Sequence, residues 1–380
     1  MLYRRFGKTE VQIPVFSCGG MRYQYSWDDA ETPNITDNSQ ENLRNCIYRA
    51  FDLGIYHIET ARDYGTSEIQ LGQVLPELPR EQLILQTKVP PYKDPKEFED
   101  VLEHSLANLR MESIDLFAFH GINLPEHLEW SVNGCYQVAE RWRREGRIKN
   151  IGFSSHASTD LIVKTIQTGL FDYVNLHYYF FLQKNDPAVV AATQRDMGVF
   201  IISPSDKGGR LYDPPQKLTE LCQPYSPMVF NDLFCLSDKR IHTLSLGAAR
   251  PSDFDEHMKT LPLLENQQRT QEIENRINQA MLDFHGEEWI KNWDKGLPEV
   301  HQTPGNVNLY EILRFYNMAK ALDMLSFGRM RYELLGQKNH WFPGTQLYNT
   351  SKEALLASLV NSPFPEKIAE AVFEADEMFK

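Results

Sequence analysis

The chain has few cysteines and no apolar run long enough to cross a membrane. Its 380 residues include five cysteines, and none stands in a Cys-x-x-Cys pair. Disulfide frameworks and metal clusters depend on such spacings, so neither is expected. No stretch approaches about 18 uninterrupted apolar residues, and the N-terminus carries no apolar segment typical of a signal peptide. The sequence therefore predicts a cytoplasmic protein without a membrane partner.

Positive charge is also scarce. Thirty-nine Lys and Arg residues stand against 52 Asp and Glu residues, which gives a net charge of -13. Binding of nucleic acid of any sequence needs a dominant basic field, so nucleic acid is excluded as a partner. The chain also lacks the Gly-x-Gly-x-x-Gly turn of a doubly wound dinucleotide-binding domain.

Short apolar runs alternate with helical patterns along the first 260 or so residues, which is typical of a parallel sheet with crossover helices. Eight such units match the size of a TIM barrel. The expected strands are 15–19, 56–59, 83–87, 114–119, 148–153, 173–176, 199–202 and 243–246. The expected helices are 41–53, 95–109, 132–145, 159–168 and 187–196.

Two further segments complete the predicted organisation. Residues 2–13 indicate a two-stranded hairpin that plugs the barrel floor, and beyond residue 264 charged and helical patterns replace the alternation. We therefore expect an α/β fold with two parts. Residues 1–264 would form a TIM (β/α)8 barrel with its N-terminal hairpin, and residues 265–380 an all-helical C-terminal extension with helices near 309–324, 352–359 and 365–379.

Polar residues follow four successive expected strands. Tyr64 follows Glu59 at the end of the second strand, Lys88 ends the third, His120 the fourth, and Ser154 the fifth. Barrel enzymes collect their reactive groups at the carboxyl ends of the strands, so these side chains should share one rim.

The same segments resemble motifs of the aldo-keto reductase family, in the family's order and over roughly residues 1–261. The resemblance rests on four motifs: Glu-Thr-Ala-x-x-Tyr-Gly-x-Ser-Glu from Glu59, Thr87-Lys88-Val89, Leu116 to His120, and Gly152-Phe153-Ser154-Ser155. It implies an NAD(P)H-dependent oxidoreductase that reduces a small-molecule aldehyde or ketone.

Hydride delivery to a carbonyl carbon leaves negative charge on oxygen, which must be stabilised and protonated. Tyr64 is the expected proton donor, and the ammonium of Lys88 is expected to lower its pKa. Glu59 should pair with that ammonium, although the family usually has Asp there, and His120 should orient the substrate oxygen. These four residues form the predicted catalytic set.

A nicotinamide cofactor is implied by the resemblance, with NADPH preferred and NADH as the other candidate. Arg250 would contact a 2′-phosphate near a helix N-terminus, which favours anions, while Asp253 is interpreted as a first-turn helix acid. The residues implied in cofactor binding are Gly20, Met21, Ser154, Ser155, Asn175, Ser203, Ser205, Lys207, Arg250 and Glu256.

The substrate and the C-terminal extension leave further questions. The loop 21–39, with Tyr23, Tyr25 and Trp27, should wall the substrate pocket together with residues 178–180; alternatively these aromatics pack against the C-terminal part. Residues 303–309 and 363–368 resemble the ferredoxin-like tail of some aldo-keto reductases. No cysteine follows Cys235, so a cluster would have been lost.

Two other functions are left open. His57, His120, His156 and His177 near strand ends could suggest a metal-dependent TIM-barrel hydrolase, although His57 is better explained as a core histidine. The substituted Glu59 and the added helices could instead indicate a regulatory barrel that binds NAD(P)H with weak turnover. The sequence identifies neither the carbonyl compound nor the oligomeric state.

Overall fold

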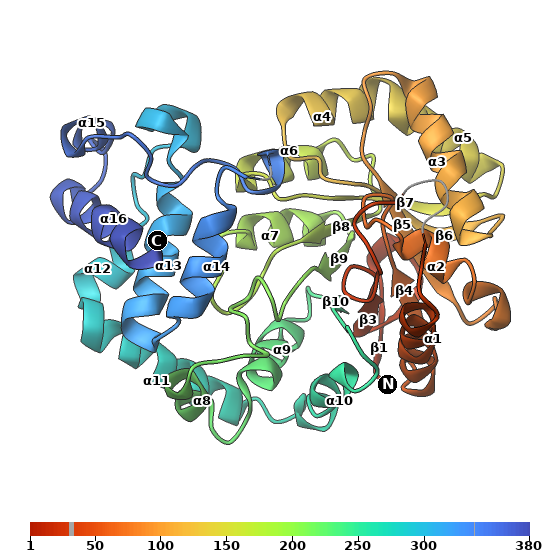
Figure 1. Cartoon of the computed structure of the whole chain (residues 1–380), viewed down its shortest axis with the longest axis horizontal. Helices are drawn as coiled ribbons and strands as arrows, with labels where there is room; N and C mark the ends of the chain where they lie inside the picture. Colours follow the sequence, from red (N-terminus) through yellow and green to blue (C-terminus); the bar gives the residue numbers. More distant parts are fainter. Residues whose placement is uncertain (30–33, 338) are drawn as a thin grey trace. The chain divides into compact units, whose positions relative to one another are not determined.

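The computed structural model describes residues 1–29, 34–337 and 339–380, and it contains a closed barrel of eight parallel strands. The strands pair in the order β10-β3-β4-β5-β6-β7-β8-β9, which confirms the predicted TIM barrel (Figure 1). All eight expected apolar runs are strands. They are β3 (Phe16–Gly19), β4 (His57–Glu59), β5 (Ile84–Val89), β6 (Ile114–Phe119), β7 (Ile148–Ser154), β8 (Tyr173–Leu176), β9 (Gly198–Ile201) and β10 (Thr243–Leu246).

Helices connect successive strands. They are α1 (Asp37–Asp52), α2 (Ser67–Leu71), α3 (Pro95–Leu109), α4 (Pro125–Trp130), α5 (Tyr136–Arg144), α6 (Thr159–Gln167), α7 (Asp186–Gln194), α9 (Pro227–Ser237) and α10 (Asp253–Met258). The start of α3 follows from sequence, because Asp94 accepts a hydrogen bond from the Lys96 backbone N–H and Pro95 suits the first helical position.

One expected helix, 132–145, is divided in the structure. Residues Ser131–Cys135 form a π-helical turn, η3, before α5 begins. Gly134 in this turn packs against Pro95 at the start of α3, and a Cβ there would lie 2.4 Å from Pro95 Cγ. The π-helical turn therefore packs closely against the start of α3. The periodicity of apolar residues in the sequence does not predict such a turn.

The N-terminal hairpin consists of antiparallel β1 (Tyr3–Arg5) and β2 (Gln12–Pro14). Phe6 inserts between them into the core, where it joins a cluster with Tyr173 and Phe200 of the barrel. Gly7 has φ +54°, and the neighbouring Lys8 N–H donates to Asp196 O at 2.6 Å. The hairpin thus plugs the barrel as expected.

The chain divides into two compact units. The barrel unit comprises residues 1–208 and 231–265, and the helical unit comprises 209–230 and 266–380. Residues 209–230 thus group with the helical unit. The predicted division into 1–264 and 265–380 has one boundary and places these residues in the barrel.

In the helical unit, α13 (Leu309–Leu322) lies beside α14 (Leu325–Leu334) and α16 (Pro365–Phe379), as Figure 1 shows, and also contacts α11 (Gln268–His285). Within the described ranges, no helix combines the length and apolar character needed to cross a membrane. The helices of this unit are α8 (Gln216–Cys222), α11 (Gln268–His285), α12 (Glu287–Asn292), α13 (Leu309–Leu322), α14 (Leu325–Leu334), α15 (Lys352–Ser358) and α16 (Pro365–Phe379).

Candidate active site

A buried ion pair lies at the carboxyl ends of neighbouring strands. Lys88 from β5 bonds one oxygen of the Glu59 carboxylate from β4, and its ammonium also donates to Thr60 O at 2.6 Å. Ser245 of β10 donates to the other carboxylate oxygen at 2.7 Å. A buried charge is costly unless it is paired and hydrogen-bonded. Both conditions are met, so the substituted Glu59 still reaches Lys88.

Tyr64 and His120 complete the group. Lys88 Nζ lies 4.9 Å from the centroid of the Tyr64 ring. That ring meets the His120 ring edge to face, with centroids 5.6 Å apart and an interplanar angle of 83°. His120 is buried and Tyr64 is half-buried. The structure thus brings together all four residues that the sequence assigns to catalysis.

The electrostatics of Tyr64 differ from the sequence prediction. Burial raises the pKa of the Tyr64 phenol well above its usual value, and the carboxylates of Glu59 and Asp63 raise it further. The expected lowering of this pKa by Lys88 is therefore wrong, because Glu59 compensates the ammonium and burial disfavours the phenolate. The phenol stays protonated at neutral pH and can donate its proton.

His120 is also affected by burial, which lowers its pKa, while the nearby carboxylate of Asp63 opposes that change. Asp63 Oδ2 lies 3.2 Å from His120 Nδ1. Asp63 is not among the site residues predicted from the sequence, although it directly precedes Tyr64. Ser245 is not among them either, because it carries no signal beyond its place at the end of the last strand.

The turn that carries Tyr64 is clamped to the loop after β3. Thr66 N–H donates to Ser26 O at 3.0 Å, and Tyr25 N–H donates to Thr66 Oγ1 at 3.0 Å. Gly65 has φ +52°, and a Cβ there would lie 1.9 Å from Ser26 O, so the close approach requires glycine. This clamp fixes the backbone directly after Tyr64.

The aromatic residues of the expected pocket wall differ in their exposure. Trp27 is 63% exposed and Tyr25 45%, but Tyr23 is buried. Residues 30–33 of the expected loop 21–39 lie outside the described residues. Residues 178–180 are buried as well, and the rings of Tyr178 and Phe180 pack against Phe234 of α9. Phe234 of α9 thus covers Tyr178 and Phe180, and the place of residues 178–180 in the wall of a substrate pocket stays a prediction.

Asn175 of β8 stands out among the expected cofactor-binding residues. Its side chain is fully buried, yet neither Oδ1 nor Nδ2 has a hydrogen-bond partner within the part of the chain that the structure describes. Buried amides are normally satisfied, so the site suits a ligand that offers both a donor and an acceptor.

Ser154 and Ser155 support the loop that follows His120. Ser154 Oγ accepts from Gly121 N–H at 2.9 Å, and Ser155 Oγ donates to Ile122 O at 2.7 Å. Their hydroxyls thus hold the backbone beside His120.

The loops after β3 and β9 meet through an ion pair of Arg22 with Asp206, at 2.6 Å. The second loop turns tightly at Ser203, where φ is 53° and the carbonyl accepts from Lys207 N–H at 3.1 Å. Ser203, Ser205, Lys207 and Met21 are half-buried. Gly20 packs against β4 so closely that a Cβ would lie 2.8 Å from Glu59 O.

Arg250 and Glu256 flank the start of α10. Asp253 accepts from the Ala249 and Arg250 backbone N–H groups at 2.9 and 3.2 Å and bonds the Arg250 side chain at 2.9 Å. It therefore occupies the backbone donors before α10, as a first-turn acid should. Glu256 bonds Lys259 at 2.6 Å.

The histidines that suggested a metal site make other contacts. His57 bonds Ser17 at 2.5 Å and Gln86 at 3.1 Å, as expected of a core histidine. His156 and His177 bond each other at 2.8 Å. In residues 1–29, 34–337 and 339–380, no group of three or more His, Cys, Asp or Glu side chains could hold a metal ion.

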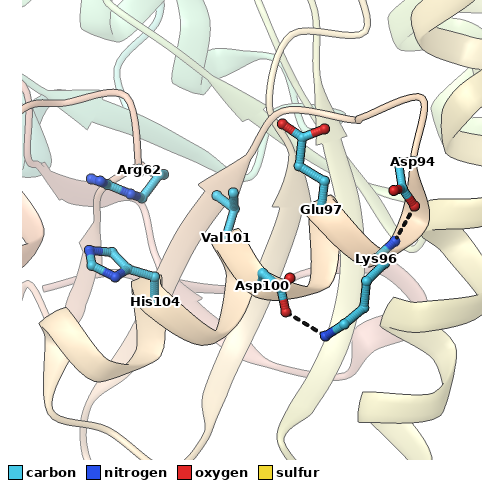
Figure 2. A pocket seen from close by; sticks show the side chains of 7 residues that line it. All are labelled: Arg62, Asp94, Lys96, Glu97, Asp100, Val101 and His104. Atoms are coloured by element: carbon cyan, nitrogen blue, oxygen red, sulfur yellow. Dashed lines mark hydrogen bonds and ion pairs between the residues drawn. The ribbon is translucent and has the colours of Figure 1, made fainter.

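A surface pocket of about 450 Å³ lies along α3 and shares no residue with the Glu59–Lys88 group (Figure 2). Arg62 and His104 face each other across it, and Asp94 and Asp100 both contact Lys96 at one end. None of the residues predicted to act in catalysis or cofactor binding lines it.

The chain is similar to several known reductases over part of its length. It is 28% identical over 211 residues to a probable aldo-keto reductase 1 of Glycine max, a match that covers 52% of this chain and 57% of that protein. It is 27% identical over 173 residues to an L-glyceraldehyde 3-phosphate reductase of Escherichia coli, covering 41% and 46%. The chain thus spans about half the length of these curated relatives.

Solved structures share the fold. A thermostable aldo-keto reductase in complex with the inhibitor epalrestat superposes with a TM-score of 0.61 at 20% identity, covering 73% of this chain and all of that one. The holo form of an aldo-keto reductase from Bacillus halodurans gives 0.59 at 17% identity, covering 73% and 96%. At these identities the likeness concerns the barrel architecture.

The sequence profile of the aldo/keto reductase family matches residues 17–210, just over half of the chain. The matched segment runs from β3 through the loop after β9. It therefore includes the strand ends that bring Glu59, Tyr64, Lys88 and His120 together. With motif order, barrel topology and this match in agreement, the chain belongs to the aldo/keto reductase family.

Proposed function

We propose that this chain reduces aldehydes or ketones with NAD(P)H, with Tyr64 as the proton donor. One observation carries the proposal: a protonated phenol lies against both the Lys88–Glu59 ion pair and the His120 ring. A reduction needs such a donor where negative charge develops on the substrate oxygen.

The residues of the chain would act as follows. Tyr64 donates its hydroxyl proton to the substrate oxygen, and His120 orients that oxygen. The Lys88–Glu59 pair, held by Ser245, stabilises the negative charge that remains on Tyr64. Burial of these groups limits access of water and strengthens their interactions.

A nicotinamide cofactor would supply the hydride when bound. The unsatisfied amide of Asn175 fits its carboxamide, which offers one donor group and one acceptor. NADPH is the proposed form, with Arg250 as the contact for a 2′-phosphate and NADH as the second candidate. A relative of 28% identity over 153 residues is named an NADH-specific methylglyoxal reductase of Escherichia coli. A test of cofactor binding therefore needs both NADPH and NADH.

The alternative functions lose their motivating observations. The regulatory barrel was suggested partly by Glu59, yet Glu59 bonds Lys88. The metal hydrolase was suggested by four histidines. His57 bonds core residues, His156 and His177 bond each other, and His120 contacts Asp63. For the C-terminal helices we propose a tail related to the ferredoxin-like type that lacks cluster cysteines, since no cysteine follows Cys235.

The test is a fluorescence titration of the protein with NADPH and NADH, followed by mixing of each complex with simple aldehydes, methylglyoxal and quinones. Saturable binding with oxidation of the cofactor supports the proposal. Tyr64→Phe should lower the reduction rate more than about 100-fold, while the cofactor Kd changes less than about threefold. Unchanged turnover in this variant would remove Tyr64 from its proposed role, and absence of binding would reject the cofactor.

A further inference from the structure

Asp63 places a second carboxylate beside the catalytic group. It occupies one of the two unspecified positions of the Glu-Thr-Ala-x-x-Tyr motif, directly before Tyr64. Its Oδ2 lies 3.2 Å from Nδ1 of His120, and the two side chains are 43% and 6% exposed respectively. A partly exposed carboxylate, that of Asp63, thus contacts the buried imidazole ring of His120.

The contact has a chemical consequence for the imidazole. A neutral histidine carries one proton, on either Nδ1 or Nε2, and an ionised carboxylate can only accept. Asp63 therefore favours the proton on Nδ1. A substrate carbonyl oxygen also only accepts, so Nε2 can donate to it only when the ring carries both protons.

Within residues 1–29, 34–337 and 339–380, the other charged groups around His120 do not replace Asp63. Glu59 already bonds Lys88 and Ser245, and the Lys88 ammonium disfavours a second positive charge on His120. Tyr64, whose ring edge meets the imidazole, is protonated and neutral. Among the residues that the structure describes, Asp63 thus provides a carboxylate within ion-pair distance of the ring.

We propose that Asp63 is a positioning residue for His120: its carboxylate holds one proton on Nδ1 and favours the doubly protonated ring, so that Nε2–H is presented to the oxygen of the carbonyl substrate. This inference rests on the proposed reductase function. It predicts that reduction requires protonated His120, and that the rate is full below the pKa of His120 and declines as pH rises through it.

The first test is the pH profile of kcat/KM for Asp63→Asn. Loss of the carboxylate lowers the pKa of His120, so the alkaline decline should move down by about one pH unit. Turnover at neutral pH should fall on the order of tenfold, with little change in cofactor Kd. Asp63→Glu should recover part of the rate and of the profile. Asp29→Asn, which removes a carboxylate that pairs with Arg62 instead, is the matched control and should leave the profile in place.

The second test does not depend on turnover. Nitrogen-15 NMR of the histidine rings in the full chain, with the His120 signal assigned by its loss in His120→Gln, reports which nitrogen carries the proton. We expect Nδ1–H in the neutral ring of the wild type, and we expect the ring to lose its second proton at a lower pH in Asp63→Asn than in the wild type. An unchanged titration of the His120 ring in Asp63→Asn would overturn the inference.

The two tests separate the possible failures. A wild type that binds and oxidises cofactor, with an unchanged pH profile in Asp63→Asn, rejects the role of Asp63 and leaves the reductase proposal intact. A wild type with no turnover toward any carbonyl rejects the reductase proposal, and the presentation of Nε2–H to a substrate falls with it, whatever tautomer the spectra show.

Discussion

The Lys88 ammonium and the Glu59 carboxylate form an ion pair in which the two side chains keep only 1% and 4% of their surface exposed. Ser245 binds the carboxylate oxygen that faces away from Lys88. The longer Glu side chain is therefore held at both oxygens, so the departure from the family's usual Asp preserves the pairing.

Removal of this carboxylate charge should destabilise the fold. Glu59→Gln leaves the Lys88 ammonium buried without a counter-ion, and the free energy of unfolding should fall by about 3–5 kcal/mol. Denaturant unfolding measures the difference. Ser245→Ala removes one hydrogen bond and should cost about 1 kcal/mol. Equal losses in both variants would mean that the ion pair is no more important than the hydroxyl contact.

Asn175 offers a prediction in which stability and binding change in opposite directions. Asn175→Leu removes two unsatisfied polar atoms from the core, so the cofactor-free protein should gain about 1 kcal/mol. Cofactor affinity should fall on the order of tenfold, because the amide's proposed hydrogen bonds to the carboxamide are lost.

Asn185→Leu is the matched control for this substitution. Asn185 is also buried, but its amide donates to His177 O and accepts from Thr159, both at 2.9 Å. This variant should lose stability rather than gain it. A loss of stability in Asn175→Leu as well would indicate that Asn175 has a structural role and no ligand.

Arg250 tests the choice between the two nucleotides. Its side chain is 76% exposed and pairs with Asp253, so its contribution is modest. Arg250→Ala should raise the Kd for NADPH about three- to tenfold and leave that for NADH nearly unchanged. Lys259→Ala removes a positive charge at the other end of α10 and serves as the control. Equal effects on both nucleotides would place Arg250 away from the 2′-phosphate.

His57 makes the stability of the barrel depend on pH. Burial lowers the pKa of His57 to about 4, while the unfolded chain titrates near 6.5. The unfolded state therefore binds more protons between these values, and stability is full above about pH 6.5 and declines as pH falls toward 4. From pH 7 to 5 the free energy of unfolding should drop by about 2 kcal/mol through this residue. His57→Gln should show a correspondingly shallower decline, and an identical decline would assign it to other groups.

Much of the fold follows from local patterns. Every expected barrel strand is present, and α3 and α16 begin and end at the expected residues. Apolar periodicity is a short-range feature, and so are the Asp94 cap of α3 and the proline in the first turn of each helix. The polar residues at the ends of successive strands also predict that these side chains lie together at one rim of the barrel. The family resemblance linked Glu59, Tyr64, Lys88 and His120 from the sequence alone.

Other features depend on contacts between distant residues. Ser245 lies 186 positions from Glu59, and nothing in its neighbourhood marks it as a partner. The buried state of Tyr178 and Tyr179 depends on surrounding packing, including the contact of Tyr178 with α9. The fragmented helix at 131–144 similarly depends on the approach of Pro95 to Gly134.

The sequence by itself determined the barrel, its strand order and the residue types gathered at one rim, since these follow from periodicity and from the parallel direction of the strands. Only the tertiary structure decided the electrostatics. The pKa of Tyr64 rises rather than falls because burial and two carboxylates outweigh a lysine that is already paired. A side chain's exposure and its nearest charges are properties of packing in three dimensions, and no spacing along the chain encodes them directly.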